Sequence, residues 1–214
     1  YKVTVIDNLS NGDIKNLNKA VNKIKFIKDD INNIKKYKKK ISKIDYCIHL
    51  AALADIVPSI TNPDKYFNSN VKGTFELLNF LKNYNLKKFI YIASSSCYGI
   101  VTTKKTSENS QIDLRYPYAL TKKLGEDLAM HWFHIYKIPT ISLRLFNVYG
   151  LRSRTSGTYG AVLGIFLKQK LSKKPLTIVG NGKQTRDFIY VSDVVSAIIK
   201  SMESKIVGEI FNIG

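Results

Sequence analysis

The sequence predicts an α/β fold built on a mostly parallel, doubly wound sheet, in a chain of 214 residues of which 44% are hydrophobic. Short apolar runs typical of buried strands alternate with longer segments that keep helical spacing. Polar residues directly follow two of these strands, where ligands bind in such sheets. No apolar run approaches the ~18 residues of a membrane-spanning helix, so no membrane segment is expected.

Strands are predicted where β-branched and aromatic residues cluster between turn signals. The first, at residues 1–7, ends in Asp7 and is followed by a turn that contains Asn11 and Gly12. The same pattern recurs along the chain at 24–27, 44–50, 88–93 and 140–146.

Helices are predicted between these strands. Residues 62–84 form the longest, because Pro63 suits the first helical position and apolar residues follow at helical spacing. Residues 13–23 are a helix or a loop, and residues 99–117 are a long loop. Further helices are expected at 32–42, 118–136, 161–171 and 192–202.

The chain is predicted to divide near residue 150. Residues 1–149 carry the alternating strands and helices of a Rossmann-type dinucleotide-binding domain. From Gly150 onward a loop rich in Gly, Ser, Thr and Arg leads into an apolar helix and short strands. We interpret residues 150–214 as the start of a substrate-binding lobe, with part of 184–202 packing back on the first domain.

The net charge of +18 suggests a nucleic-acid partner, but the composition argues against one. Of the 34 basic residues 29 are Lys, and the densest run, at 35–43, holds six Lys and no Arg fork suited to phosphate or guanine. We predict a solvated helix face instead. The two cysteines, Cys47 and Cys97, are too few for a disulfide framework or a zinc site, which favours a reducing cytoplasm and no metal.

Tyr118 and Lys122 stand four residues apart, which places them on one face of a helix. A nearby cation favours phenolate, so Lys122 is expected to lower the pKa of Tyr118. A shift from ~10 to ~7 needs about 4 kcal/mol, more than one exposed lysine supplies, so a second positive charge such as an oxidised nicotinamide is required. The alternative is an ordinary Tyr/Lys pair on a surface helix.

Ser94, Ser95 and Ser96 follow the strand at 88–93 directly. A hydroxyl there can bind a substrate oxygen and relay its proton to the phenol, although a serine-rich turn could also simply end the strand. Asp7 stands where an acceptor for the ribose hydroxyls of a dinucleotide is needed, although an Asp-Asn turn is common after any strand. Cys97 has no sequence link to a histidine, so it is not predicted to be a nucleophile.

Motifs recur in a fixed order along nearly the whole chain. They are Val-Ile-Asp-Asn-Leu-Ser-Asn-Gly at 5–12, Asp-Ile at 30–31, His-Leu-Ala-Ala at 49–52, Asn-Val-Lys-Gly-Thr at 70–74, Ser-Ser-Ser-Cys-Tyr-Gly at 94–99, Tyr-Pro-Tyr-Ala-Leu-Thr-Lys at 116–122, Arg-Leu-Phe-Asn-Val-Tyr-Gly at 144–150 and Gly-Asn-Gly-Lys-Gln-Thr-Arg-Asp-Phe-Ile-Tyr-Val-Ser-Asp at 180–193. Together they resemble the extended short-chain dehydrogenase/reductase family, specifically its nucleotide-sugar epimerases of the UDP-glucose 4-epimerase type.

The resemblance implies NAD as the cofactor. It places the adenosine ribose at Asp7 and Asn8 and the adenine beside Asp30 and Ile31. The remaining cofactor-binding residues that it implies are Ser10, Asn11, Gly12, Leu50, Ala51, Ala52, Ala54, Asn70, Tyr118, Lys122 and Phe146.

The resemblance also assigns catalytic and substrate-binding residues. Tyr118 is the base, Lys122 binds the nicotinamide ribose, and Ser94 is the catalytic hydroxyl. The residues implied to bind substrate are Ser94, Ser95, Ser96, Tyr118, Asn147 and Arg186, with Arg186 clamping the diphosphate.

Two departures from the family pattern lead us to expect an internal fragment. The glycine-rich phosphate loop that follows the family's first strand is absent. In the strand order 3-2-1-4-5-6, the lacking strand belongs between those at 2–6 and 44–50. The sequence also stops at Gly214, before most of the family's sugar-binding lobe.

We therefore predict an NAD-dependent 4-epimerase acting on a nucleotide-diphosphate sugar, with a UDP-sugar as the expected substrate. The alternatives are a decarboxylase or a 4,6-dehydratase of the same family, or a non-catalytic nucleotide-binding Rossmann protein. A 4,6-dehydratase of this group typically carries Thr-Asp-Glu where this chain has Ser94, Ser95 and Ser96, which disfavours dehydration. By resemblance, a homodimer would form through helices near 64–84 and 118–136.

Overall fold

Strand β4 (Lys88–Ser94) forms the centre of the fold, because it is buried along almost its whole length. In this computed structural model, which describes residues 1–37, 40–41, 43–101, 105–153, 162–178 and 180–214, β4 pairs in parallel with β3 (Tyr46–His49) and β5 (Thr140–Leu145). Strand β8 (Glu209–Ile213) joins β5, so the order is β3-β4-β5-β8. The predicted parallel α/β fold of the Rossmann type is confirmed.

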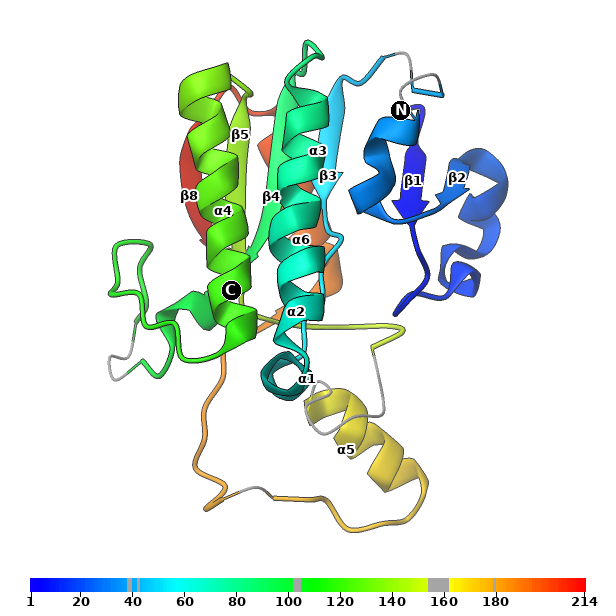
Figure 1. The fold of residues 1–214 in the computed structure, drawn as a ribbon. Helices are drawn as coiled ribbons and strands as arrows, with labels where there is room; N and C mark the ends of the chain where they lie inside the picture. Colours follow the sequence, from blue (N-terminus) through cyan, green and yellow to red (C-terminus); the bar gives the residue numbers. More distant parts are fainter. Residues whose placement is uncertain (38–39, 42, 102–104, 154–161, 179) are drawn as a thin grey trace.

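Two further parallel pairs flank this sheet. Strand β1 (Thr4–Asp7) pairs with β2 (Lys25–Lys28), and β6 (Asn147–Tyr149) pairs with β7 (Phe188–Tyr190). The β1–β2 pair lies on the β3 side of the central sheet (Figure 1), and no ladder joins β1 to β3 among the described residues.

Helices cover both faces of the central sheet (Figure 1). Helices α3 (Gly73–Leu81) and α4 (Pro117–Tyr136) lie on one face, and α6 (Val191–Glu203) lies on the other. Because side chains alternate along a strand, Phe89 and Tyr91 pack on the α3/α4 side, whereas Ile90 and Ile92 pack on the α6 side. The described residues also form the helices α1 (Ile56–Thr61), α2 (Pro63–Tyr66) and α5 (Val162–Leu171).

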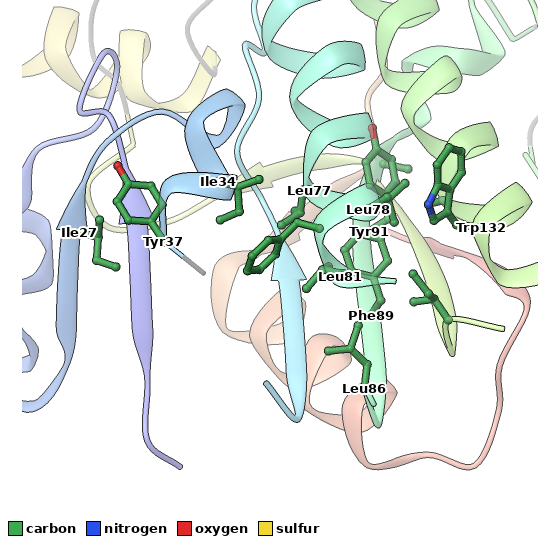
Figure 2. Packing of buried hydrophobic residues seen from close by; sticks show 14 residues of the cluster. Ile27, Ile34, Tyr37, Leu77, Leu78, Leu81, Leu86, Phe89, Tyr91 and Trp132 are labelled. Carbon is green, nitrogen blue, oxygen red and sulfur yellow. The ribbon is translucent and has the colours of Figure 1, made fainter. Parts of the chain in front are cut away.

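The larger hydrophobic cluster lies between α3, α4 and the sheet, as Figure 2 shows. Leu78 and Leu81 of α3 and Trp132 of α4 meet Phe89 and Tyr91 of β4 there. These buried contacts hold α4, the helix that carries Tyr118, against the strand that ends in Ser94.

Residues 62–84 are not one regular α-helix as predicted. Helix α2 continues into a π-helical turn at Phe67–Lys72, and α3 follows. The predicted helix at 32–42 is instead a 3₁₀ helix over Ile31–Tyr37, because like-charged lysines one turn apart disfavour an α-helix. Residues 38–39 and 42 of the predicted helix lie outside the described residues. Residues 13–23, predicted to be a helix or a loop, contain a 3₁₀ helix over Ile14–Lys23 that is kinked at Asn18.

The segment after residue 150 returns to the central sheet. Val194 and Ile198 of α6 pack with Ile90 and Ile141 of the sheet, and β8 forms its edge. The loop predicted at 150–160 lies mostly outside the described residues. No helix among the described residues combines the length and the apolar content that a membrane span requires.

Gly125 allows α4 to approach the sheet closely. A Cβ at this position would overlap the Tyr91 hydroxyl, would lie 2.9 Å from Tyr91 Cζ, and would lie 3.1 Å from the Asn70 carbonyl oxygen. The Tyr91 hydroxyl also donates a hydrogen bond to the Lys122 carbonyl, 3.1 Å away. The glycine therefore sets the depth at which the helix that carries Tyr118 and Lys122 sits.

We expect Gly125→Ala to lower the free energy of unfolding by about 1–3 kcal/mol, the usual cost of overpacking. This cost exceeds the gain of up to ~1 kcal/mol that alanine brings to a helix interior. Urea unfolding measures the difference. Combining the change with Tyr91→Phe removes the overlapping hydroxyl and should restore part of the loss. An alanine variant at least as stable as the wild type would contradict the close packing.

Candidate active site

The serines predicted from the sequence form a tight turn at the carboxyl end of β4. Ser94 ends the strand, and a 3₁₀ turn over Ser95–Tyr98 follows. The Ser94 hydroxyl accepts a hydrogen bond from the Ser96 backbone N–H at 3.2 Å. Gly99 closes the turn with φ of 64°, a conformation that favours glycine.

Tyr118 lies in the first turn of α4 and points its phenol at this serine turn. Burial raises the pKa of Tyr118 above its ordinary value, and the nearby Tyr66 phenol and Asp55 carboxylate add to the effect. The Ser94 and Ser96 hydroxyls act in the opposite direction. The net direction is therefore the reverse of the one predicted from the Tyr118/Lys122 spacing, because burial outweighs the groups that favour phenolate.

Lys122 is buried beneath the turn and makes its contacts on the side of β4. Its ammonium donates a hydrogen bond to the Ile92 carbonyl at 2.5 Å and lies 4.5 Å from the centre of the Tyr91 ring. Burial lowers the pKa of Lys122 to about 7, against the opposing effect of Glu126. The site thus holds an amine that is poised between its charged and neutral forms near neutral pH.

The side chain of Asn70 ties the loop after β3 to α4. Its carboxamide oxygen accepts the Leu53 N–H at 2.8 Å, and its nitrogen donates to the Leu53 carbonyl at 3.0 Å and to the Thr121 hydroxyl at 3.1 Å. Asn70 is 1% exposed, so this amide holds the predicted cofactor-cleft loop rather than presenting itself to solvent. The cleft residues of that loop are half-buried or exposed: Leu50, Ala51, Ala52 and Ala54.

The residues predicted at the adenosine end surround the carboxyl ends of β1 and β2. Asp7 accepts the Leu9 N–H at 2.6 Å, and a Cβ on Gly12 would lie 3.3 Å from its second oxygen. Asn8 donates to Asp30 at 2.8 Å. Burial acts to raise the pKa of Asp30, but hydrogen bonds from Asn32 and Asn8 lower it below its ordinary value, so Asp30 stays an anion.

The neighbouring predicted residues differ in exposure. Ser10, Asn11 and Gly12 are exposed, whereas Ile31 is half-buried at the start of the 3₁₀ helix.

The predicted substrate-binding residues Asn147 and Arg186 donate hydrogen bonds to backbone carbonyls. Asn147 donates through both its backbone and its side chain to the Asp187 carbonyl, at 3.1 and 2.9 Å. Arg186 is exposed and donates to the carbonyl of its neighbour Thr185 at 2.8 Å. Phe146 is half-buried beside the end of β5.

Asp55 and Tyr66 belong to this site, although the sequence analysis did not identify them. The Tyr66 ring lies edge-on to the Tyr118 ring at 6.4 Å between centres, and its hydroxyl accepts the Asp55 backbone N–H at 3.2 Å. The available signal was the position of Asp55, just after a strand-end motif at the carboxyl edge of the sheet.

Two polar groups at this edge fit a bound dinucleotide and substrate. The Ser96 hydroxyl is buried and makes no hydrogen bond of ordinary geometry to a described group. The buried Lys122 ammonium donates to the Ile92 carbonyl, and ribose hydroxyls would accept its other protons. The described residues contain no cluster of three or more metal-ligating side chains.

The cysteines do not add a nucleophile to this site. Burial raises the pKa of Cys47 to about 12 and that of Cys97 to about 11. The reactive species of a cysteine is the thiolate, so neither thiol is activated near neutral pH.

Known proteins resemble this chain in sequence and in fold. The chain is 31% identical to a UDP-N-acetyl-alpha-D-glucosaminuronate decarboxylase of Bacillus cytotoxicus, over 100% of this chain and 67% of that protein. The fold of this chain matches that of the UDP-N-acetylglucosamine 4-epimerase of Methanobrevibacter ruminantium M1, solved in complex with UDP-N-acetylmuramic acid. The TM-score is 0.93 and the identity 35%, over 100% of this chain and 68% of that one.

A second structure carries the cofactor as well as a sugar nucleotide. The UDP-glucuronic acid 4-epimerase of Bacillus cereus, in complex with UDP-glucuronic acid and NAD, matches with a TM-score of 0.89 and 34% identity, over 100% of this chain and 69% of that one. The chain thus spans about two thirds of the length of these relatives. The family model described as "NAD dependent epimerase/dehydratase family" matches residues 1–214. The chain therefore belongs to the NAD-dependent epimerase/dehydratase family of enzymes, whose cofactor is NAD.

Proposed function

We propose that this chain carries the catalytic residues of an NAD-dependent 4-epimerase of a nucleotide-diphosphate sugar, with a UDP-sugar as substrate. The observation that carries the proposal is the Tyr118 phenol beside the Ser94 and Ser96 hydroxyls at the carboxyl end of β4, with buried Lys122 one helical turn later. A protein that only bound nucleotides would not need a phenol and a buried amine at this edge.

In the proposed mechanism, Tyr118 removes the proton of the sugar 4-hydroxyl, directly or through the Ser94 hydroxyl. When bound, NAD would be the reversible acceptor of the hydride from C4 of the sugar. The serine hydroxyls favour phenolate, so they help Tyr118 to act as the base. The 4-keto sugar would then rotate to present its opposite face, the hydride would return to C4 on that face, and Tyr118 would return its proton to the oxygen, so that the configuration at C4 is inverted.

The cofactor would lie along the carboxyl ends of the strands. Asp7 and Asn8 would bind the adenosine ribose, Asp30 and Ile31 would border the adenine, and Lys122 would bind the other ribose. The loop that Asn70 holds would line the cleft between them.

Asp55 favours a second candidate function. The serine turn holds no acid, which argues against dehydration, but the Asp55 carboxylate acts on Tyr118 from the neighbouring loop. An acid close to the reacting sugar could protonate a leaving hydroxyl, as a 4,6-dehydratase requires.

Product analysis separates these candidates. The protein is supplied with UDP-glucose, UDP-N-acetylglucosamine, their C4 epimers and UDP-glucuronic acid, and the anomeric NMR signals of the products are recorded. The proposal expects interconversion of C4 epimers. A 4-keto-6-deoxy sugar would establish dehydration instead, and a pentose nucleotide with release of CO₂ would establish decarboxylation.

We expect Arg186→Ala to raise KM for the nucleotide sugar roughly tenfold or more, because a charge-assisted hydrogen bond to a phosphate contributes about 1.5–3 kcal/mol. The exposed guanidinium is available for such a contact. Calorimetric titration with UDP measures the loss, and NAD content should not change. Equal UDP affinity in wild type and variant would remove Arg186 from the substrate site.

We also propose a homodimer formed through the outer faces of α3 and α4. Large apolar side chains are exposed on or next to these helices: Phe67, Phe75, Leu120, Ile135 and Tyr136. Sedimentation equilibrium tests this proposal. We also propose a cytoplasmic location, because the chain has only two cysteines, and no nucleic-acid partner, because 29 of its 34 basic residues are lysines.

A further inference from the structure

A buried ion pair joins α4 to β5 two turns after Tyr118. Arg144 Nη2 lies 2.7 Å from Glu126 Oε1, and Arg144 Nε donates to Glu126 Oε2 at 3.0 Å. The Ser142 hydroxyl donates to Glu126 Oε2 at 2.9 Å. Arg144 is 3% exposed and Glu126 is 1% exposed, so both charges are removed from water.

The remaining terminal nitrogen of Arg144 reaches the serine turn. Arg144 Nη1 donates to the Tyr98 hydroxyl at 2.6 Å and to the Glu108 carbonyl at 3.2 Å. The Tyr98 hydroxyl in turn donates to the Asn212 carboxamide oxygen on β8 at 2.8 Å. Tyr98 is the last residue of the 3₁₀ turn that begins at Ser95, so the guanidinium holds the end of that turn.

Two of the three partners of Arg144 belong to the two halves of the proposed active site. Glu126 shares α4 with Tyr118 and Lys122, whereas Tyr98 shares the serine turn with Ser96. Arg144 itself lies opposite Ala93 in the β4–β5 register, next to the residue where the turn starts. We infer that Arg144 is a positioning residue for the reaction: its guanidinium fork joins Glu126 to Tyr98 and thereby sets the distance between the Tyr118 phenol and the serine hydroxyls.

A positioning role accounts for charges that stability alone does not require. Taking an ion pair out of water costs free energy, and buried pairs are often no more stable than apolar replacements. Burial acts to lower the pKa of Arg144, but hydrogen bonds with Glu126 and Tyr98 raise it above its ordinary value, so the fork stays charged. A planar guanidinium can bind a carboxylate with two nitrogens and a phenol with the third, which a lysine cannot do.

Tyr98→Phe tests the inference, which rests on the proposed function, because it removes the Arg144–Tyr98 hydrogen bond, together with the Tyr98–Asn212 bond, and leaves the ion pair in place. We expect kcat to fall about tenfold or more, since small misplacements of reacting groups are costly, while KM for the sugar stays within about twofold. Tyr84→Phe is the matched control: it removes a phenol hydrogen bond of 3.0 Å to the Ile41 carbonyl, far along the chain from the site. Its kcat should equal that of the wild type.

A second measurement does not depend on turnover. NMR of ¹³C-labelled tyrosine, assigned by comparison with Tyr118→Phe, follows the titration of the Tyr118 phenol in the protein without substrate. The phenol faces Ser94, Ser96, Tyr66 and Asp55, and only the two serines lower its pKa. Loss of the link should therefore move the titration of Tyr118 to higher pH in Tyr98→Phe and not in Tyr84→Phe.

The two readouts separate this inference from the proposed function. A wild type that converts no nucleotide sugar would refute the function, and the titration would still decide the role of Arg144. A titration of Tyr118 that is the same in Tyr98→Phe and wild type would overturn the inference. Arg144→Lys, which keeps the charge and loses the fork, should shift the titration in the same direction as Tyr98→Phe.

Discussion

Tyr118→Phe is expected to lower kcat at least a hundredfold, in line with the ~10²–10⁴ that a positioned base contributes. Phenylalanine keeps the ring that meets Tyr66 edge-on, so the packing of α4 should not change. Only the oxygen that exchanges the proton is lost. Steady-state turnover of the nucleotide sugar measures the effect, and the NAD content of the purified protein should match that of the wild type.

Tyr116→Phe is the matched control for this change. Tyr116 lies two residues earlier and is 40% exposed, so loss of its hydroxyl should leave turnover unchanged. Wild-type turnover in Tyr118→Phe would show that another group is the base. Circular dichroism of both variants at the assay temperature tests whether Tyr118→Phe is folded.

Lys122→Met is expected to weaken NAD binding and to change how stability depends on pH. Burial lowers the pKa of Lys122 to about 7, whereas a lysine in an unfolded chain titrates near ~10.4. Between these values the unfolded state binds more protons, so this residue makes the free energy of unfolding of the wild type rise with pH from about 7 to ~10.4. Methionine has no charge to bury, so the variant should gain most over the wild type at or below pH 7.

Urea unfolding of both proteins at pH 7 and at pH 9.5 measures this difference, and calorimetry measures NAD affinity. Lys65→Met, at an exposed position on α2, controls for the general effect of removing a lysine. A stability difference that does not shrink with rising pH would show that Lys122 is not desolvated in the native state. Unchanged NAD affinity would remove it from the cofactor site.

The proposed catalytic set was identified from the order of motifs along the chain. Ser94, Tyr118 and Lys122 were identified because a strand end and the i, i+4 spacing of a helix are local features. The structure brings all three to one sheet edge. Helix and strand identities were predictable for the same reason, whereas the π-helical turn at Phe67–Lys72 was not, because the single extra residue in its turn leaves no local pattern.

The direction of the Tyr118 pKa could not be predicted from spacing. Lys122 lies on the expected face of α4, but its ammonium bonds the Ile92 carbonyl, and burial raises the pKa of the phenol instead. Desolvation depends on everything packed around a group, and the groups around Tyr118 come from the serine turn, the loop that holds Asp55, and α2. No window of sequence contains those segments together.

The sequence was sufficient for the fold class, the family resemblance and the choice of the proposed reacting groups, because strand periodicity, helix spacing and strand-end chemistry are local features of a few residues. Only the tertiary structure placed Asp55 and Tyr66 beside Tyr118. It also bonded Asn70 to the loop at Leu53. In addition, it joined Glu126 to Tyr98 through Arg144. These contacts connect residues that lie far apart in the chain. Their formation depends on how closely α4 sits on β4, which the packing of Gly125 against Tyr91 decides.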